Sequence, residues 1–257
     1  MSALLLEQEI EYPTSDGQPM AETPEHVQAI FDTLHGLQRR YVTTPNVWVG
    51  ANFFLFYERG NPKARVSPDV MLAKGVAQGN RQNYLLWREP SPSLVVEMTS
   101  RKTRRKDSGP KKSLYERIGT EEYILFDPFG DYLRPRLQGF RLRRGRYQPI
   151  PLELDGSLLS RTTGLRMRPE GKRLRLVDAA TGEAILWPDE LDEARAREAA
   201  ARLTEAAARR AAEARAQAAE AKAAEETAAR LAETAARQAT EERLRALEEE
   251  LSRLRRT

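Results

Sequence analysis

Two acidic residues stand in short apolar segments that are typical of buried strands. Asp69 precedes Val70-Met71-Leu72, and Glu97 lies within Leu94-Val95-Val96-Glu97-Met98. A charged side chain is rarely placed in such a strand unless a partner or ligand compensates its charge. Since carboxylate oxygens suit Mg²⁺ or Mn²⁺, the two residues predict a divalent-cation site if their strands are neighbours. The alternative is that Asp69 belongs to a Pro-Asp turn and that Glu97 pairs with an arginine.

Lys111 lies on the apolar face of a predicted helix over residues 110–118, with proline in its first turn. Three apolar residues follow it at the i+3, i+4 and i+7 positions of that face: Leu114, Tyr115 and Ile118. A lysine that faces inward needs an anion, which Asp69 and Glu97 would supply. The alternative is that Lys111 extends along the surface to reach solvent. Lys112 is expected on another face, as an exposed pair with Glu116.

A basic run separates the Glu97 segment from this helix. Its members are Arg101, Lys102, Arg104, Arg105 and Lys106. Such a run suits the phosphate backbone of a nucleic acid, although a solvated charged segment is the alternative. A second basic cluster falls on a predicted hairpin and comprises Arg141, Arg143, Arg144 and Arg146. No base-reading module is recognisable, so no sequence specificity is inferred.

The elements that must position these residues alternate between helix and strand. The expected elements are a helix over 22–41, strands over 47–57, 66–72, 94–99 and 123–126, an irregular segment up to residue 89, and hairpins pairing 139–142 with 147–150 and 165–167 with 174–176. The helix over 22–41 carries an apolar stripe that is expected to face the core, made of Val27, Ile30, Phe31, Leu34 and Leu37. The pattern predicts an α/β domain around a mixed β-sheet, with flanking helices and added hairpins.

A change in composition near Pro188 marks a second region. Residues 188–257 contain no glycine and no aromatic residue and are rich in Ala, Arg and Glu, which predicts one long helix. Its last leucines, spaced 3-4-3, are Leu244, Leu247, Leu251 and Leu254. This spacing favours a short coiled coil and therefore a homodimer, whereas a single solvated helix held by Glu–Arg pairs is the alternative. The predicted domains are accordingly residues 1–187 and 188–257.

Composition excludes several classes of protein. The chain of 257 residues has no cysteine and two histidines, which excludes thiolate zinc sites and cysteine nucleophiles and disfavours histidine metal cages. The mean hydropathy is −0.65, and neither a membrane span nor a signal peptide is expected. The net charge is +4; residues 188–257 carry 14 basic and 16 acidic residues, so the basic excess lies in residues 1–187. We expect a cytoplasmic protein.

Several of these motifs resemble the Uma2 family, formerly known as domain of unknown function 820. The resemblance rests on Pro68-Asp69, the segment 95–100, Thr103-Arg104-Arg105-Lys106-Asp107, the segment 111–115, Glu122-Tyr123 and Phe126-Asp127-Pro128, together with Asp16 to Thr23 and the charged tail. That family is placed in the PD-(D/E)XK nuclease superfamily. The resemblance covers roughly residues 10–186 and implies a restriction-endonuclease-like fold.

The resemblance also implies roles for individual residues. Asp69 and Glu97 would bind Mg²⁺, and Lys111 would orient or deprotonate the attacking water. The third position of the superfamily's Glu-x-Lys signature is Thr99 here, so the lysine would come from the following helix. Glu22 resembles the auxiliary acidic residue of the superfamily. His26, one turn after Glu22, is expected on the helix surface, and a place in the site is the alternative.

The sequence therefore predicts a Mg²⁺-dependent endonuclease that acts on nucleic acid, with DNA as the expected substrate. Two other functions are compatible with the same fold. One is a nucleic-acid-binding protein without cleavage activity, and the other is an adaptor that acts through its coiled coil. Three buried charges at Asp69, Glu97 and Lys111 argue against both, because a core without catalysis would be more stable without them.

Overall fold

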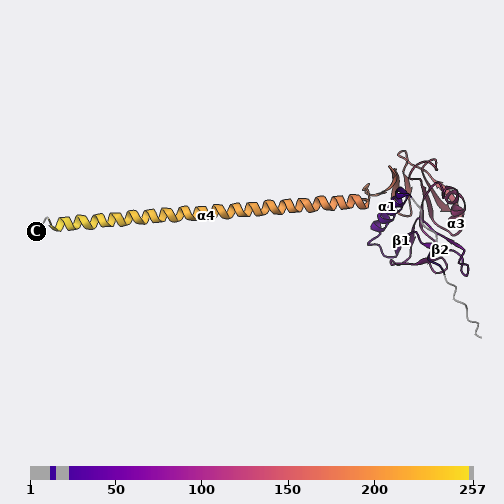
Figure 1. Cartoon of the computed structure of the whole chain (residues 1–257), viewed down its shortest axis with the longest axis horizontal. Helices are drawn as coiled ribbons and strands as arrows, with labels where there is room; N and C mark the ends of the chain where they lie inside the picture. The colour runs from indigo at the N-terminus through magenta and orange to yellow at the C-terminus, as the bar shows by residue number, and fades with distance from the viewer. Residues whose placement is uncertain (1–11, 16–22, 255–257) are drawn as a thin grey trace, which may run out of the picture. The chain divides into compact units, whose positions relative to one another are not determined.

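The computed structural model describes residues 12–15 and 23–254, which form two compact units. The first unit extends to Leu191 and the second begins at Asp192. The elements of the first unit are α1 (Pro24–Arg40), β1 (Val47–Ala51), β2 (Phe54–Phe56), β3 (Arg65–Val66), β4 (Val70–Lys74), β5 (Asn83–Leu85), β6 (Leu94–Met98), α2 (Arg104–Lys106), the π-helical turn η1 (Asp107–Lys111), α3 (Lys112–Arg117), β7 (Glu122–Phe126), β8 (Leu137–Arg143), β9 (Arg146–Ile150), β10 (Leu158–Ser160), β11 (Leu165–Glu170) and β12 (Arg173–Asp178) (Figure 1). Helix α4 (Pro188–Leu254) begins in the first unit and makes up the described part of the second.

The described strands form three sheets, of which the largest organises the first unit. Its strand order is β1-β4-β6-β7-β8-β9; β6 and β7 are parallel, and the other neighbours are antiparallel. The smaller sheets have the orders β10-β11-β12 and β3-β2-β5. This confirms the predicted α/β class with a mixed sheet and added hairpins. Both hairpins predicted after residue 137 are present as β8–β9 and β11–β12.

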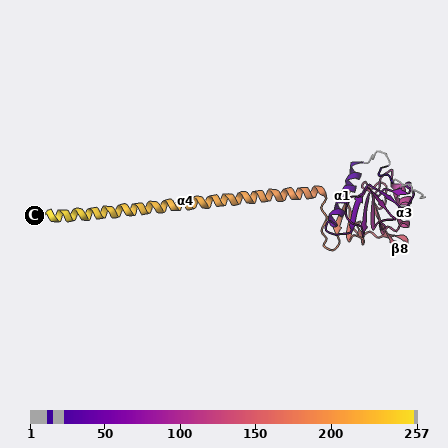
Figure 2. The ribbon, with the colours of Figure 1, turned by 90° about the horizontal axis from the view of Figure 1, so that it is seen from below.

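The alternation of side chains along the central strands divides the core into two layers. On one face, Val96 and Met98 of β6 pack with α1 and with the sheet β10-β11-β12. On the other, Val95 packs with α3 and with the sheet β3-β2-β5. Figure 2 shows α1 and α3 on opposite sides of the strands. Because β6 is buried along its whole length, its single acidic residue must be compensated within the protein or by a ligand.

Two predicted strands are interrupted. The segment 47–57 divides into β1 and β2, which belong to different sheets, and Asn52 between them has a φ of 51°. The segment 66–72 divides into β3 and β4 around Ser67-Pro68-Asp69. A proline cannot donate a ladder hydrogen bond, so a continuous strand through Pro68 is disfavoured. The segment expected to be irregular also contains the short strand β5.

The buried face of α1 differs from the predicted apolar stripe. Ile30 and Leu37 are buried as expected, but Val27 and Phe31 are 43% and 51% exposed. The packed face carries polar and small residues instead: His26, Asp32, Thr33 and Gly36. Gly36 allows α1 to approach β12 closely, since a Cβ there would lie 2.7 Å from Leu176 Cδ1. Apolar spacing alone therefore misplaces the inward face by part of a turn.

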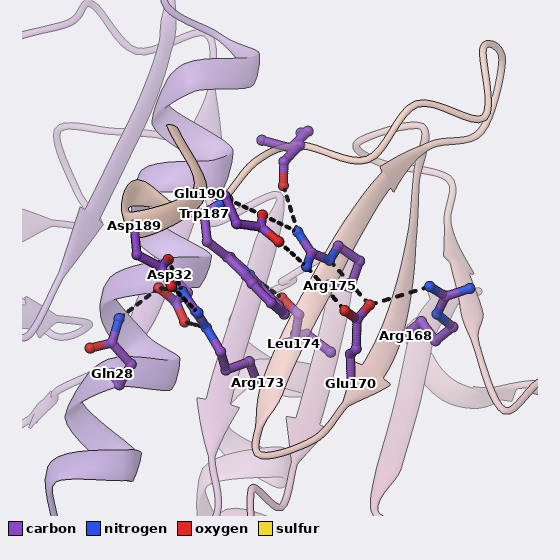
Figure 3. Close-up of polar contacts among 11 residues, drawn as sticks. Gln28, Asp32, Arg168, Glu170, Arg173, Leu174, Arg175, Trp187, Asp189 and Glu190 are labelled. Carbon is purple, nitrogen blue, oxygen red and sulfur yellow. Dashed lines mark hydrogen bonds and ion pairs between the residues drawn. The ribbon is translucent and has the colours of Figure 1, made fainter. Parts of the chain in front are cut away.

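A cluster of charged residues around Trp187 holds the first turn of α4 within the first unit (Figure 3). The guanidinium carbons of Arg173 and Arg175 lie 3.7 Å and 3.2 Å from the Trp187 ring centroid. Arg173 binds Asp189, and Arg175 binds Glu190, each through two hydrogen bonds. Further carboxylates complete the pairing, Asp32 of α1 on Arg173 and Glu170 of β11 on Arg175. We refer to Trp187 and these six charged residues as the Trp187 clamp.

Helix α4 has 67 residues and is about 100 Å long at 1.5 Å per residue. Beyond its first turn its described side chains are exposed, and Leu244 and Leu247 remain 59% and 52% exposed. Ion pairs four residues apart, such as Arg202–Glu198 and Arg209–Glu213, support the helix along its length. Within the described residues, no helix combines the length and the apolar character needed to cross a membrane.

Candidate active site

The central sheet brings Asp69 and Glu97 to the same end of two neighbouring strands. β4 and β6 run antiparallel with Val70 opposite Val96, so the start of β4 lies beside the end of β6. Asp69 immediately precedes β4, and Glu97 is the fourth residue of β6. The Asp69 Oδ2 accepts a hydrogen bond of 2.7 Å from the Met98 backbone N–H. The Asp69 N–H lies 3.4 Å from the Glu97 Oε2.

Lys111 reaches the same place from the helical segment that covers this face of the sheet. Its Nζ lies 2.7 Å from the Glu97 Oε2 and donates to the Ser67 carbonyl oxygen at 3.1 Å. The helical geometry places Lys111 at the end of η1, directly before α3. The structure therefore brings together the three residues that the sequence analysis singled out.

The electrostatics of this cluster are dominated by burial and by an excess of carboxylates. Burial raises the pKa of Glu97, the Lys111 ammonium opposes this shift, and the Asp69 and Asp107 carboxylates reinforce it. Burial alone would lower the pKa of Lys111, but Glu97, Asp69 and Asp107 together raise it above its ordinary value. Lys111 is therefore charged at neutral pH, and one cation faces three carboxyl groups.

The resemblance implies a Mg²⁺ ion, so the oxygen atoms of this cluster can be compared with the ligands that Mg²⁺ prefers. Asp69 and Glu97 provide hard oxygen atoms, and the excess of carboxylates over cations favours a bound positive charge. Buried oxygens of Thr99 and Asp107 beside them have no hydrogen-bond partner in the described part of the chain. Across residues 12–15 and 23–254, no three His, Cys, Asp or Glu side chains are grouped as a metal site. The residues fit a Mg²⁺ ion that keeps several waters or takes phosphate oxygens as its other ligands.

Three further residues belong to this cluster; Tyr115 and Asp107 were not predicted as part of it, and His26 was considered only as the alternative to a surface position. Tyr115 donates a hydrogen bond of 3.2 Å to the Glu97 Oε1 from one turn beyond Lys111. The Asp107 carboxylate is 1% exposed, and its Oδ1 lies 3.7 Å from the Lys111 Nζ. His26 is buried, with its Nε2 4.0 Å from the Asp69 Oδ2, so the expectation of a surface histidine is wrong. The i, i+4 spacing of Asp107 and Lys111 was the available signal for Asp107.

The surroundings of Lys112 differ from the prediction. The Lys112 Nζ lies 3.5 Å from the centroid of the Phe140 ring and is half-buried there, away from the cluster around Glu97. Glu116, its expected partner, accepts hydrogen bonds from Arg146 and from the Tyr147 backbone. The prediction of an exposed Lys112–Glu116 pair is therefore wrong. Lys111 and Lys112 do face different neighbours, as predicted.

The basic run lies on the surface. In the sequence it directly precedes Asp107. Its five members are all exposed: Arg101, Lys102, Arg104, Arg105 and Lys106. In the second basic cluster, Arg143 and Arg144 are exposed at the β8–β9 turn. Arg141 instead pairs with the buried Glu122 at 2.7 Å, which makes its role structural. Glu22 lies outside the described residues.

A cavity of about 510 Å³ lies elsewhere in the first unit. It is bounded by the end of α1, by β1 and by residues 78–81, with Tyr41, Trp48 and Phe53 in its lining. None of the residues around Glu97 lines it. The charged cluster, rather than this cavity, holds the groups that could perform chemistry.

Comparisons with known proteins agree with the resemblance noted from the motifs. The model of the Uma2 family, described as "Putative restriction endonuclease", matches residues 3–170. Among solved structures, the chain is similar to a putative nuclease belonging to DUF820 from Anabaena variabilis ATCC 29413, with 11% identity and a TM-score of 0.42. That match covers 56% of this chain and 76% of the other. None of the curated proteins matches.

Proposed function

This chain belongs to the Uma2 family, whose model covers residues 3–170, and from this nuclease membership we propose a more specific activity. The protein is a Mg²⁺- or Mn²⁺-dependent endonuclease that hydrolyses phosphodiester bonds in nucleic acid, with DNA as the substrate. The observation that carries the proposal is the meeting of Asp69, Glu97 and Lys111 at one end of the central sheet. Charged groups gathered at the edge of a core are costly to bury, which is explained if they act on a ligand.

In the proposed mechanism, Asp69 and Glu97 hold the divalent cation. When bound, it would lower the pKa of a coordinated water and neutralise charge that develops on the phosphate. The Lys111 ammonium lies beside Glu97 and donates hydrogen bonds, so it can orient the attacking water and stabilise charge on a phosphate oxygen. Because its pKa is raised, this orienting role is favoured over removal of a proton from the water.

The exposed basic run supplies the expected contact with the phosphate backbone. All five of its members are exposed and therefore accessible to a phosphate backbone: Arg101, Lys102, Arg104, Arg105 and Lys106. Neutralisation of several phosphates by such residues gives binding that weakens as salt increases. The proposed auxiliary role of Glu22 rests on the family resemblance alone.

A cleavage assay tests the proposal directly. Supercoiled plasmid and single-stranded DNA and RNA are incubated with full-length protein and Mg²⁺ or Mn²⁺, with EDTA as the metal-free control. We expect metal-dependent cleavage by the wild type and a loss of about 100-fold or more in Asp69→Ala, since that variant lacks a cation ligand. Asp131→Asn, an exposed acidic residue outside the cluster, is the matched control and should cleave normally.

The outcomes separate the proposed activity from its alternatives. Binding of nucleic acid without cleavage would replace the endonuclease with a binding protein on the same fold. Equal cleavage by wild type and Asp69→Ala would contradict the assigned site. Preference for RNA over DNA would correct the substrate and leave the mechanism standing.

A further inference from the structure

Asp107 is a buried carboxylate on which Lys111 is the foremost compensating group, with smaller contributions from Thr103, Thr99 and His26. It opens the π-helical turn η1 and is 1% exposed, whereas Arg104, Arg105 and Lys106 before it are all exposed. The Tyr123 hydroxyl donates to the Asp107 backbone oxygen and therefore does not compensate the carboxylate. Burial of a carboxylate is costly even when a cation lies nearby, so this side chain calls for a functional explanation.

The contacts of the Asp107 carboxylate point to Lys111. Its Oδ1 lies 3.7 Å from the Lys111 Nζ, too long for a hydrogen bond but close enough for a strong charge interaction. Neither carboxylate oxygen has a hydrogen-bond partner among the residues that the structure describes. Both oxygens are therefore able to accept a hydrogen bond from an ammonium group that moves by about 1 Å.

Lys111 and a divalent cation would compete for Glu97. The Glu97 Oε2 accepts from the Lys111 Nζ at 2.7 Å, and the Oε1 accepts from the Tyr115 hydroxyl at 3.2 Å. If Glu97 binds a cation, one of these oxygens must supply a lone pair to it. Two cations on one carboxylate repel each other, which weakens the hold of Glu97 on the ammonium. Asp107 is the carboxylate next in reach.

We propose that Asp107 is a positioning residue that takes over the Lys111 ammonium when Glu97 binds the divalent cation. The exchange would let one small site hold both the ammonium and the cation, and it would keep the Lys111 ammonium within the site. Asp107 and Lys111 are the first and last residues of η1, and their i, i+4 spacing places both side chains on one side of the segment. This inference rests on the proposed function.

Binding of Mn²⁺ alone tests the proposal without reference to cleavage. Calorimetric titrations compare full-length wild type, Asp107→Asn, Lys111→Met and the double variant. We expect Asp107→Asn to weaken Mn²⁺ binding about 10-fold, because Lys111 then stays on Glu97 and competes with the metal. Lys111→Met should strengthen binding. In the Lys111→Met background, Asp107→Asn should change the affinity by less than about 3-fold, since no ammonium remains to be held.

Matched variants distinguish positioning from a structural role. Asp107→Glu keeps the carboxylate and should restore Mn²⁺ affinity to near the wild-type value, whereas Asp131→Asn removes an exposed charge and should leave it unchanged. Asp107→Asn removes a buried charge and is expected to fold at least as well as wild type, which thermal unfolding checks. Asp107→Ser gives the same comparison if the amide cannot be accommodated.

Each outcome decides one point. An equal loss of affinity in both backgrounds would mean that Asp107 acts on the metal directly, which overturns the positioning role. No loss in Asp107→Asn would overturn it as well. A wild type that neither binds Mn²⁺ nor cleaves would instead overturn the proposed function and this inference with it. Binding by the wild type together with additive effects overturns the inference alone.

Discussion

At the scale of single residues, Lys111 decides the charge balance of the candidate active site. It is the cation beside Glu97, and the Asp69 and Asp107 carboxylates act on it as well. Without Lys111, the buried Glu97 would face two other carboxylates with no ammonium nearby. Glu97 would then take up a proton more readily, since burial already raises its pKa. Loss of Lys111 therefore alters both the orienting group and a proposed metal ligand.

Lys111→Ala is expected to abolish cleavage while the fold remains intact. The cost of breaking a buried ion pair is about 3–5 kcal/mol, and protonation of Glu97 offsets part of it. Lys112→Ala is the matched control. It removes a contact with the Phe140 ring that is worth about 0.5–1 kcal/mol, so it should lower the Tm slightly and leave cleavage unchanged. Cleavage rates and thermal unfolding of both variants provide the measurement.

Equal losses of cleavage in the two variants would contradict the distinct positions of the two side chains. A Lys111→Ala variant that cleaves at the wild-type rate would remove the lysine from the mechanism. Loss of cleavage together with loss of the folded state would be resolved by Lys111→Met, which keeps the aliphatic part of the side chain in place.

Some of these residues could be predicted from the sequence and others could not. Asp69 and Glu97 stood out because an acidic residue in an apolar strand is a strong anomaly, and Lys111 because of its place on an apolar helix face. For His26 the only signal was its place one turn after Glu22, and its burial could not be predicted, since the register of α1 depends on its packing against β12. Asp107 was hidden in a basic run, where its burial is decided by tertiary contacts rather than by local pattern.

At the scale of elements, the helical segment over Arg104–Arg117 is longer than the predicted helix over residues 110–118. The sequence suggested a start at Pro110, because proline is favoured in the first turn of a helix. Instead, Pro110 lies inside the segment, within η1. Proline cannot donate the hydrogen bond to the residue four positions earlier, and the wider π turn accommodates it. The helical segment therefore begins before Pro110 and includes Asp107, which lies on the same side as Lys111 at the i, i+4 spacing.

The stability that the Trp187 clamp contributes at the first turn of α4 depends on pH. A hydrogen bond from Arg173 lowers the pKa of Asp189 to about 2, below its ordinary value near 3.8. Because the folded-state pKa is depressed, the stabilisation is fully present above about pH 4 and is lost as the pH falls towards 2. The difference in Tm between wild type and Asp189→Asn should therefore be largest near neutral pH and should vanish near pH 2.

The control for this prediction lies one turn further along the helix. Asp192→Asn changes an exposed residue that takes no part in the clamp, so its Tm difference from wild type should be small and nearly constant with pH. Thermal unfolding followed by circular dichroism at several pH values measures all three proteins. A difference for Asp189→Asn that persists at pH 2 would show that the pairing with Arg173 contributes no pH-dependent stability.

At the scale of the whole molecule, the Trp187 clamp shows where the first unit ends. The composition placed the boundary at Trp187–Pro188, but Asp189 and Glu190 pair with Arg173 and Arg175, and the first unit extends to Leu191. Composition could not reveal this, because the first turn of α4 has the same residue types as the rest of the helix. A truncation at Trp187 would remove one carboxylate partner from each guanidinium group, leaving Asp32 on Arg173 and Glu170 on Arg175.

We predict that a protein ending at Leu191 folds, binds Mn²⁺ and is less oligomeric than the full-length chain. The coiled-coil prediction rests on the leucines spaced 3-4-3, of which Leu244 and Leu247 are exposed on the helix as described. Exposed leucines at this spacing are better buried against a second copy. Light scattering at tens of micromolar should give a dimer for the full-length chain and a monomer for the truncated one.

Two controls sharpen the comparison. Leu244→Glu with Leu247→Glu should reduce dimerisation while α4 is kept, and a protein ending at Trp187 should have a lower Tm than one ending at Leu191. If two copies are needed to cut both strands, the dimer-deficient proteins should nick plasmid rather than linearise it. A monomeric full-length chain would refute the coiled coil and leave α4 as a spacer or as a surface for another partner.

Because Trp187 lies between two guanidinium groups, its fluorescence can report whether the first turn of α4 is docked. Indole emission changes in intensity and wavelength when stacked cations and the surrounding apolar contacts are removed. In a variant in which Trp48 and Trp87 are replaced by phenylalanine, the fluorescence of Trp187 would report whether the first turn of α4 stays docked. Release of the helix during metal binding or nucleic-acid binding could then be followed in real time, without attaching a dye.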